Sequence, residues 1–278
     1  MNSLAQAAIC GIAMLLCAPA GAQTLAPDAG SAVAPKTLAN ALPAPAFECK
    51  APSEFARLDR PLRHTARRLS AGEPLTIVAI GSSSTRGAGA TSPAASYPSR
   101  LAVELTKRFP RDDITVFNRG VNGEEIEQML ARFPTDVVAA HPDLVLWQVG
   151  TNAVLRDHQL QPDATLLRDG IKQIKDAGAD VVLIDMQFAP RVIVKSETPG
   201  MEDEIARAAK ESSVDLFNRF AVMREWHDVE HMPFEAFVAA DGLHMNDWGY
   251  ACVGKLLAAA ISEAATRPVT SAAIRPAH

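Results

Sequence analysis

The sequence predicts a three-layer α/β/α sandwich around a central parallel sheet, and three observations lead to this fold class. Short apolar runs alternate with longer segments of helical spacing over most of the chain. The 278 residues are 48% hydrophobic and 21% charged, a composition that suits one sizeable globular domain. Clusters of Gly, Ser, Thr and Asn follow directly after several apolar runs, where strands of an open sheet would end.

The apolar runs mark the expected strands, and the periodic segments between them mark the helices. We expect strands at residues 75–80, 114–117, 144–149, 181–185 and 214–217. We expect helices at residues 97–109, 124–133, 164–177, 203–212 and 248–265. In the first of these helices Leu101, Leu105 and Phe109 recur at helical spacing, and Pro110 ends the pattern.

The N-terminus has the pattern of an export signal. An apolar stretch over residues 7–18 is followed by Ala20-Gly21-Ala22, the small-x-small pattern at which signal peptidase cleaves. We therefore expect a signal peptide at residues 1–22 and a periplasmic or secreted protein with no stable membrane insertion after cleavage. No Lys or Arg precedes the apolar stretch, so a retained transmembrane anchor is the alternative.

The rest of the chain divides into a linker, a domain and a tail. Residues 23–46 are rich in Ala and Pro and are expected to be disordered, as is the loose tail at residues 266–278. The domain between them, residues 47–265, contains Cys49 and Cys252. Two cysteines in an exported chain indicate one disulfide, and two unrelated thiols are the alternative.

Charge and motif spacing exclude several classes of function. The formal net charge is -5 and no basic block occurs, so we expect no nucleic-acid partner. A phosphate-binding loop that starts at Gly81 would need Gly where Arg86 stands and a Lys directly after it, and neither is present, which argues against a nucleotide cofactor. The stretch from His227 to His231 matches His-x-x-Glu-His, a zinc pattern, but Pro233 follows at once and no further ligand is apparent. We therefore expect neither a cofactor nor a metal.

Four polar segments would meet at the carboxyl edge of the predicted sheet. They are residues 81–85, 118–123, 150–152 and 241–244. Together they offer what ester hydrolysis needs: an activated hydroxyl, a base oriented by an acid, and hydrogen-bond donors for the oxyanion. Asp241 and His244 are spaced so that the carboxylate can hold one imidazole nitrogen while the other faces a serine.

These segments resemble the sequence blocks of the SGNH (GDSL-like) hydrolase superfamily. The first block of that family has Gly-Asp-Ser-x-Thr, and residues 81–85 align with it so that the nucleophile falls on Ser83. The resemblance places the oxyanion hole at the Ser83 N–H, Gly120 and Asn152, and the acid and base at Asp241 and His244.

The resemblance covers roughly residues 75–265 and implies a flavodoxin-like fold and carboxylic ester hydrolase activity without a cofactor. Two positions depart from the family pattern: Ser82 replaces the acidic residue before the nucleophile, and Ala153 stands where Asp is frequent. Ser82 and Ser84 are expected to be hydrogen-bonding neighbours of the nucleophile.

Two functions of different classes fit these features. The first is an exported serine esterase that removes small acyl groups, acetyl above all, from esters or acylated glycans of the cell envelope. An acyltransferase is a variant of it. The second is a non-catalytic carbohydrate-binding or envelope-assembly protein on the same fold. Labelling by a fluorophosphonate probe separates the two classes, because only an activated serine reacts.

Overall fold

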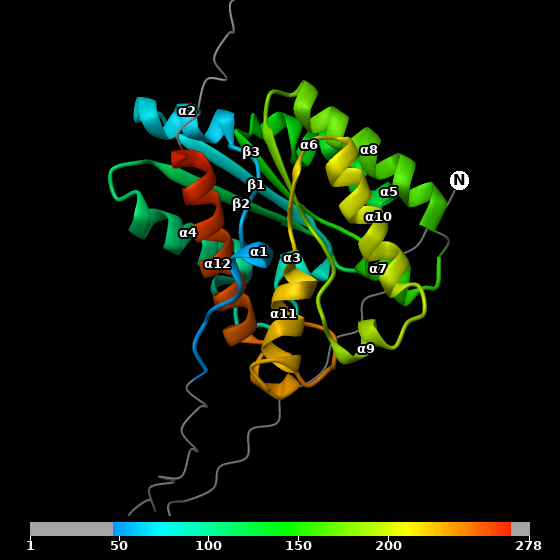
Figure 1. Ribbon diagram of the computed structural model, residues 1–278. Helices are drawn as coiled ribbons and strands as arrows, with labels where there is room; N and C mark the ends of the chain where they lie inside the picture. Colours follow the sequence, from blue (N-terminus) through cyan, green and yellow to red (C-terminus); the bar gives the residue numbers. More distant parts are fainter. Residues whose placement is uncertain (1–46, 159, 268–278) are drawn as a thin grey trace, which may run out of the picture. The chain divides into compact units, whose positions relative to one another are not determined.

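A computed structural model describes residues 47–158 and 160–267, and Figure 1 shows helices on both sides of one sheet. The sheet has five strands in the order β2-β1-β3-β4-β5, all parallel. The strands are β1 (Leu75–Gly81), β2 (Ile114–Gly120), β3 (Leu144–Gln148), β4 (Asp180–Ile184) and β5 (Asp215–Phe217). This arrangement confirms the predicted fold class. The predicted signal peptide, the linker and residues 268–278 of the predicted tail lie outside the described residues.

The two helical layers each cover one face of the sheet (Figure 1). One layer contains α2 (Arg63–Ala71), α4 (Tyr97–Arg108) and α12 (Asp247–Thr266). The other contains α5 (Ile126–Ala131), α8 (Leu160–Asp176) and α10 (Thr198–Glu211). Because both faces are covered, the inner strands β1, β3 and β4 are almost continuously apolar, and β3 is buried along its whole length, whereas no residue of the edge strand β2 is fully buried.

Short helices follow the strands at the carboxyl end of the sheet, the lower end in Figure 1. They are α3 (Ser83–Arg86) after β1, α7 (Thr151–Leu155) after β3, α9 (Pro190–Ile193) after β4 and α11 (Arg219–Asp228) after β5. Two further short helices are α1 (Ser53–Ala56) and α6 (Phe133–Asp136).

β2 is longer than predicted. The sequence places its end at residue 117, but Asn118, Arg119 and Gly120 continue to pair with Ala79, Ile80 and Gly81 of β1. The neighbouring β1 offers its backbone over this length, and the polar side chains do not interrupt the pairing. The strands β1 and β2 therefore end side by side, at Gly81 and Gly120.

The helix predicted at residues 124–133 is two helices. α5 ends at Ala131, Arg132 leaves the helical geometry (φ −108, ψ 6), and α6 begins at Phe133. Pro134 explains the break, since in an unbroken helix its ring would clash with the carbonyl four residues earlier. Phe133 then packs edge-on against the buried Trp147, with ring centroids 5.0 Å apart.

A disulfide joins Cys49, in the arm before α1, to Cys252 in α12, as predicted for an exported chain. The same arm is held by Trp226, whose indole N–H donates to the Lys50 carbonyl at 2.8 Å. Within residues 47–158 and 160–267, no helix combines the length and apolar character that crossing a bilayer requires.

Candidate active site

The turn after β1 carries the predicted nucleophile. β1 ends at Gly81, Ser82 keeps an extended backbone (φ −93, ψ −150), and α3 begins at Ser83. A Cβ at Gly81 would lie 2.2 Å from the Thr85 hydroxyl oxygen, so only glycine fits there without displacing it. The N–H and the hydroxyl of the buried Ser82 both donate to Gln148 Oε1 at 3.0 Å. Ser82 therefore anchors the turn to β3.

The three consecutive serines have three different environments. Ser84 is buried, and its hydroxyl accepts a hydrogen bond of 2.8 Å from Arg219 Nη1. Ser83 is half-buried, and its Oγ lies 2.8 Å from Nε2 of His244. Ser83 is thus the serine of this turn that contacts an imidazole, whereas Ser82 and Ser84 have structural partners.

The loop before α12 brings together Asp241 and His244. His244 Nδ1 lies 2.5 Å from Asp241 Oδ2, while Asp241 Oδ1 accepts the backbone N–H groups of Leu243 and His244 at 3.0 Å. Gly242 has φ +67, a left-handed conformation that this tight turn requires and that glycine adopts readily.

Electrostatics fix the tautomer of the histidine. Partial burial favours a raised pKa for Asp241, but the hydrogen bonds from the His244 side chain and the two backbone N–H groups outweigh it, and the net pKa is lowered. The ionised carboxylate can only accept, so Nδ1 of His244 carries the hydrogen. Nε2 then presents its lone pair to the Ser83 hydroxyl, the arrangement of a general base and its nucleophile.

Gly120 does not offer the free N–H that the sequence predicts. It is the last residue of β2, and its N–H donates to the Asn118 side-chain oxygen at 2.9 Å. The Asn118 amide in turn donates to the Thr85 carbonyl at 2.9 Å, which ties β2 to α3. A Cβ at Gly120 would lie 2.1 Å from the Arg86 backbone nitrogen. The glycine therefore permits close packing of strand and helix, and its donor is already used.

Gly123, three residues further along the chain in the loop after β2, has the features expected at Gly120. It lies in a turn with φ +79, and its N–H has no hydrogen-bond partner among the described residues. The same holds, over that part of the chain, for the Ser83 N–H. Asn152 donates one amide hydrogen to the Glu124 carbonyl at 2.8 Å, which leaves its second hydrogen for a ligand. A water-sized cavity of about 10 Å³ borders Ser82, Glu124 and Asn152.

A buried polar network that the sequence did not predict lies beneath these segments. Arg219 is completely buried and donates to Ser84 and to Oε1 of Gln187, which lies 3.0 Å away. The same Oε1 accepts the Thr151 hydroxyl, and the Gln187 amide donates to the Leu243 carbonyl at 3.2 Å. Burial lowers the pKa of Arg219, and it raises the pKa of the nearby Asp185 to about 7.

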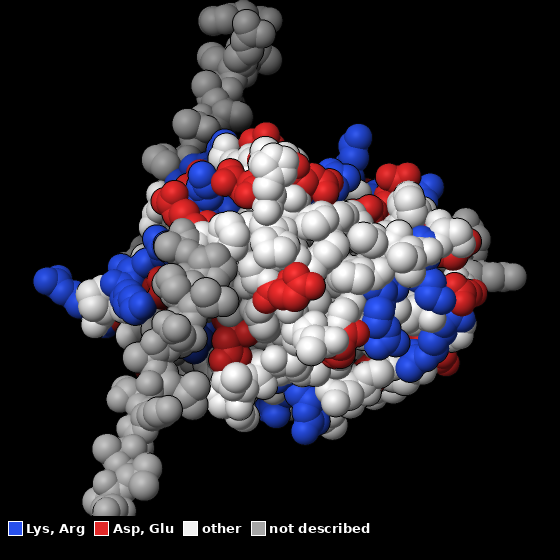
Figure 2. Space-filling view, turned by 90° about the horizontal axis from the view of Figure 1, so that it is seen from below, with Lys and Arg blue, Asp and Glu red and all other residues white. Residues whose placement is uncertain are grey.

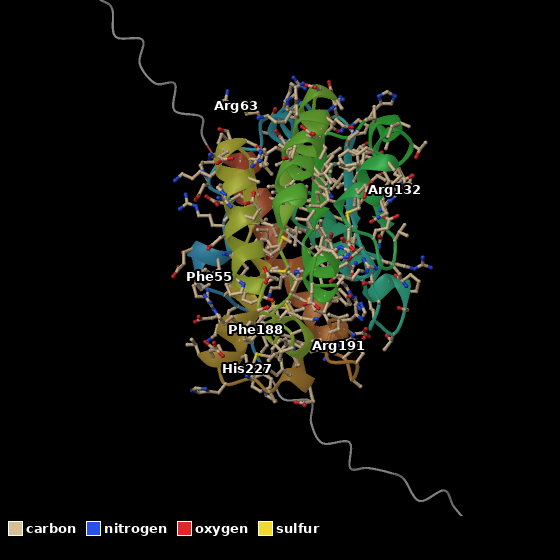
Figure 3. The ribbon with its side chains drawn as sticks, turned by 90° about the vertical axis from the view of Figure 1, so that its right-hand side faces the viewer. Phe55, Arg63, Arg132, Phe188, Arg191 and His227 are labelled. Atoms are coloured by element: carbon tan, nitrogen blue, oxygen red, sulfur yellow. A yellow bond between two sulfur atoms is a disulfide. The ribbon has the colours of Figure 1, made fainter. Side chains whose placement is uncertain are left out.

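The segment with the zinc pattern has other partners. His227 stacks on Phe234 with ring centroids 4.0 Å apart, and the Phe188 ring lies within 6 Å of both rings, 5.9 Å from His227 and 5.8 Å from Phe234. Figure 3 shows Phe188 and His227 near each other. His227 Nδ1 is within 2.9 Å of the Met232 carbonyl. Glu230 lies 3.4 Å from the ammonium group of Lys50.

The carboxyl end of the sheet faces the viewer in Figure 2. Much of the surface in view is uncharged, and its Lys and Arg side chains lie mainly around the edge of the view (Figure 2). A cavity of about 260 Å³ lies beside α3, and small or polar residues line it, among them Arg86, Thr91, Ser92 and Asn122. The cavity has room for a polar group close to the Ser83 turn.

Known proteins resemble this chain in sequence and in fold. Residues 48–267 match the non-GDSL lipase-like family. An arylesterase of Vibrio mimicus is 28% identical over 157 residues, which are 54% of this chain and 70% of that protein.

Among solved structures, a two-domain esterase active on acetylated mannans has a TM-score of 0.67 at 20% identity over 78% of this chain. The match spans 57% of that esterase. An acetylxylan esterase from Geobacillus stearothermophilus has a TM-score of 0.54 at 20% identity, over 70% of this chain and 95% of that one. At these identities the two structures show a shared fold.

Proposed function

Because the chain belongs to the non-GDSL lipase-like family, we propose that it is a serine esterase with Ser83 as nucleophile, His244 as general base and Asp241 as its orienting acid. The family membership agrees with the SGNH-type resemblance of the four sequence segments. One observation carries the proposal: His244 bonds Asp241 through Nδ1 and lies 2.8 Å from Ser83 Oγ through Nε2.

The reaction would proceed by acyl transfer in two steps. Ser83 Oγ attacks the ester carbonyl carbon while its proton passes to His244 Nε2, and His244 then gives this proton to the leaving alcohol. The products of this step are the alcohol and an acyl ester of Ser83. Water next attacks the acyl carbon as His244 takes its proton, and return of that proton to Ser83 Oγ releases the acid. Asp241 stays ionised and stabilises the imidazolium of each step.

Three donors would stabilise the oxyanion that forms in each step. They are the N–H groups of Ser83 and Gly123 and the second amide hydrogen of Asn152. Gly123 replaces Gly120 in this role, because the Gly120 N–H is bound to Asn118.

The proposed substrate is a small acyl ester, above all an acetyl group on a glycan of the cell envelope, and the enzyme is proposed to be exported. The cavity beside α3 supports this choice, since small or polar residues line it and would suit a sugar alcohol as leaving group. The activity on acetylated mannans of the two-domain esterase and the name of the acetylxylan esterase agree with it. The apolar stretch and Ala20-Gly21-Ala22 support export.

The test is a substrate series with a nucleophile variant. We expect kcat/KM to be highest for p-nitrophenyl acetate and to fall with acyl length, and we expect the protein to release acetate from acetylated xylan or mannan. Ser83→Ala should abolish both activities. A wild-type protein that hydrolyses no ester and takes no fluorophosphonate label would support the non-catalytic alternative, and acetyl transfer to an added sugar would favour the acyltransferase.

A further inference from the structure

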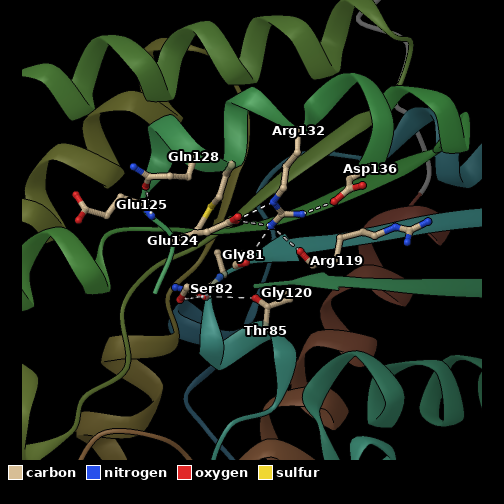
Figure 4. Close-up of polar contacts among 12 residues, drawn as sticks. Gly81, Ser82, Thr85, Arg119, Gly120, Glu124, Glu125, Gln128, Arg132 and Asp136 are labelled. Atoms are coloured by element: carbon tan, nitrogen blue, oxygen red, sulfur yellow. Dashed lines mark hydrogen bonds and ion pairs between the residues drawn. The ribbon is translucent and has the colours of Figure 1, made fainter. Parts of the chain in front are cut away.

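Arg132 lies at the break between α5 and α6 and reaches back to the strand ends beside the site (Figure 4). Its side chain is only 15% exposed. Nη2 donates to the Arg119 carbonyl at 2.8 Å and to the Gly81 carbonyl at 3.3 Å. Gly81 is the last residue of β1, just before the Ser83 turn, and Arg119 is the penultimate residue of β2, just before the loop that contains Gly123.

The same guanidinium holds that loop at a second point. Arg132 Nε donates to Glu124 Oε2 at 2.7 Å, and the Glu124 side chain is also only 15% exposed. The backbone carbonyl of Glu124 accepts the Asn152 amide at 2.8 Å. The Arg132 side chain therefore links the ends of β1 and β2. Through Glu124 it also connects them to Asn152, which carries the third proposed oxyanion donor.

We propose that Arg132 is a positioning residue of the oxyanion hole, an inference that rests on the proposed esterase function. Oxyanion donors accelerate a reaction because they are fixed before the charge develops, so a loop that shifts by a fraction of an ångström loses catalysis. Arg132 acts through geometry, because Glu124 and Asp136 flank it and offset its charge. Its fork of several N–H donors serves four acceptors at once, which the point charge of a lysine cannot do.

The test compares Arg132→Lys and Glu124→Gln with a matched control, Asp136→Asn. Asp136 accepts from Arg132 Nη1 at 2.6 Å on the side away from the strand carbonyls, as an i,i+4 pair. The readouts are kcat and KM on p-nitrophenyl acetate, the inhibition constant of a boronic acid that forms a tetrahedral adduct, the pH–rate profile and thermal unfolding.

We expect Arg132→Lys to lower kcat by about 10- to 100-fold, somewhat less than the loss of a whole oxyanion donor. KM should stay within about threefold of wild type, and boronic acid binding should weaken as kcat falls, because both depend on the tetrahedral state. The midpoint of the pH–rate profile should not move, since the contacts of His244 are intact. Glu124→Gln should show the same pattern more weakly, and Asp136→Asn should keep kcat within about twofold.

Folded Arg132→Lys and Glu124→Gln variants with wild-type kcat and boronic acid affinity would overturn the positioning role while leaving the esterase proposal standing. If Arg132→Lys does not fold, Glu124→Gln alone decides. A wild-type protein without activity on any ester would instead overturn the esterase proposal, and the positioning role with it. A fall in kcat for Asp136→Asn equal to that of Arg132→Lys would assign Arg132 a general structural role.

Discussion

Replacing Asp241 by asparagine tests how the proposed general base, His244, is held in place. In the variant, the side-chain oxygen can keep the backbone N–H groups of Leu243 and His244, so the loop should retain its shape. The amide NH₂ then faces His244 Nδ1, and a donor there forces Nδ1 to accept and places the imidazole hydrogen on Nε2. With its hydrogen on Nε2, His244 cannot take the proton of Ser83.

The magnitude follows from the contacts that are lost. A hydrogen bond to a charged group contributes about 1.5–3 kcal/mol, which alone is roughly 10- to 150-fold in rate. The wrong tautomer adds to this, and the analogous change in a serine protease costs about 10⁴-fold. Because 42% of the Asp241 side chain is exposed, water replaces part of the interaction, so we expect kcat to fall by about 10²- to 10⁴-fold.

The assay is kcat on p-nitrophenyl acetate from pH 5 to pH 9, with thermal unfolding as the control for folding. The pKa of Asp241 is lowered, so its carboxylate is ionised over this whole range and the loss should appear at every pH. Asp247→Asn is the matched control. The Asp247 carboxylate accepts hydrogen bonds from Thr91, so this substitution should leave kcat unchanged. A folded Asp241→Asn variant with kcat within about threefold of wild type would rule out Asp241 as the orienting acid.

Three further predictions concern the fold around the site. Gly120→Ala should lower the midpoint of thermal unfolding sharply, because the new Cβ would meet the backbone of α3. Gly123→Ala should lower the free energy of unfolding by only about 1–2 kcal/mol, because alanine is strained in the left-handed backbone at this position. Equal losses of stability in the two variants would contradict the packing argument. Burial raises the pKa of Asp185 to about 7, above its value near 3.9 in the unfolded chain. Between these two pH values the folded protein holds a proton that the unfolded chain has released, so the stability of the fold decreases as the pH rises. Asp185→Asn should therefore lose less stability than wild type between pH 5 and pH 8 in thermal unfolding, and a parallel loss would show that Asp185 does not titrate in this range. The disulfide joins two residues that are 203 positions apart, and the double variant Cys49→Ser/Cys252→Ser removes it. We expect the free energy of unfolding, measured by denaturant titration, to fall by about 2–5 kcal/mol. An unchanged value would mean that the bond is absent in solution.

The sequence was sufficient to predict which segments meet at the site. Parallel strands end at one edge of the sheet, so polar residues directly after apolar runs are expected there. The resemblance to the SGNH hydrolases selected Ser83 and His244 among the polar residues, and the two side chains lie in contact. The spacing of Asp241 and His244 also predicts their contact, because a three-residue separation in a tight turn brings the two side chains together.

The predicted oxyanion glycine, Gly120, was wrong because the end of β2 was predicted three residues too early. With β2 ending at residue 117, Gly120 would lie in the loop, free to approach a ligand. Backbone pairing with β1 carries the strand to Gly120, and the loop glycine is Gly123. Strand length is set by the partner strand, and a single sequence contains no direct signal of it.

The polar groups that support the site could not be predicted for a different reason. Arg132 contacts the Gly81 carbonyl, and Arg219 contacts Ser84 and Gln187, across long sequence separations. Such contacts depend on the folded arrangement of several elements. Nothing in the local pattern around Arg219 distinguishes this buried cation from a surface arginine at the start of a helix.

The most direct test of the central claim is to identify the residue that a fluorophosphonate probe modifies. The phosphonate phosphorus is attacked by the activated oxygen and fluoride leaves, so the label marks the nucleophile. We predict one label per molecule, located on Ser83 by peptide mass spectrometry, with no label on Ser83→Ala or after pretreatment with an irreversible serine hydrolase inhibitor. A label on Ser82 or Ser84, or ester hydrolysis that persists in Ser83→Ala, would contradict the assignment of Ser83, His244 and Asp241 as the catalytic triad.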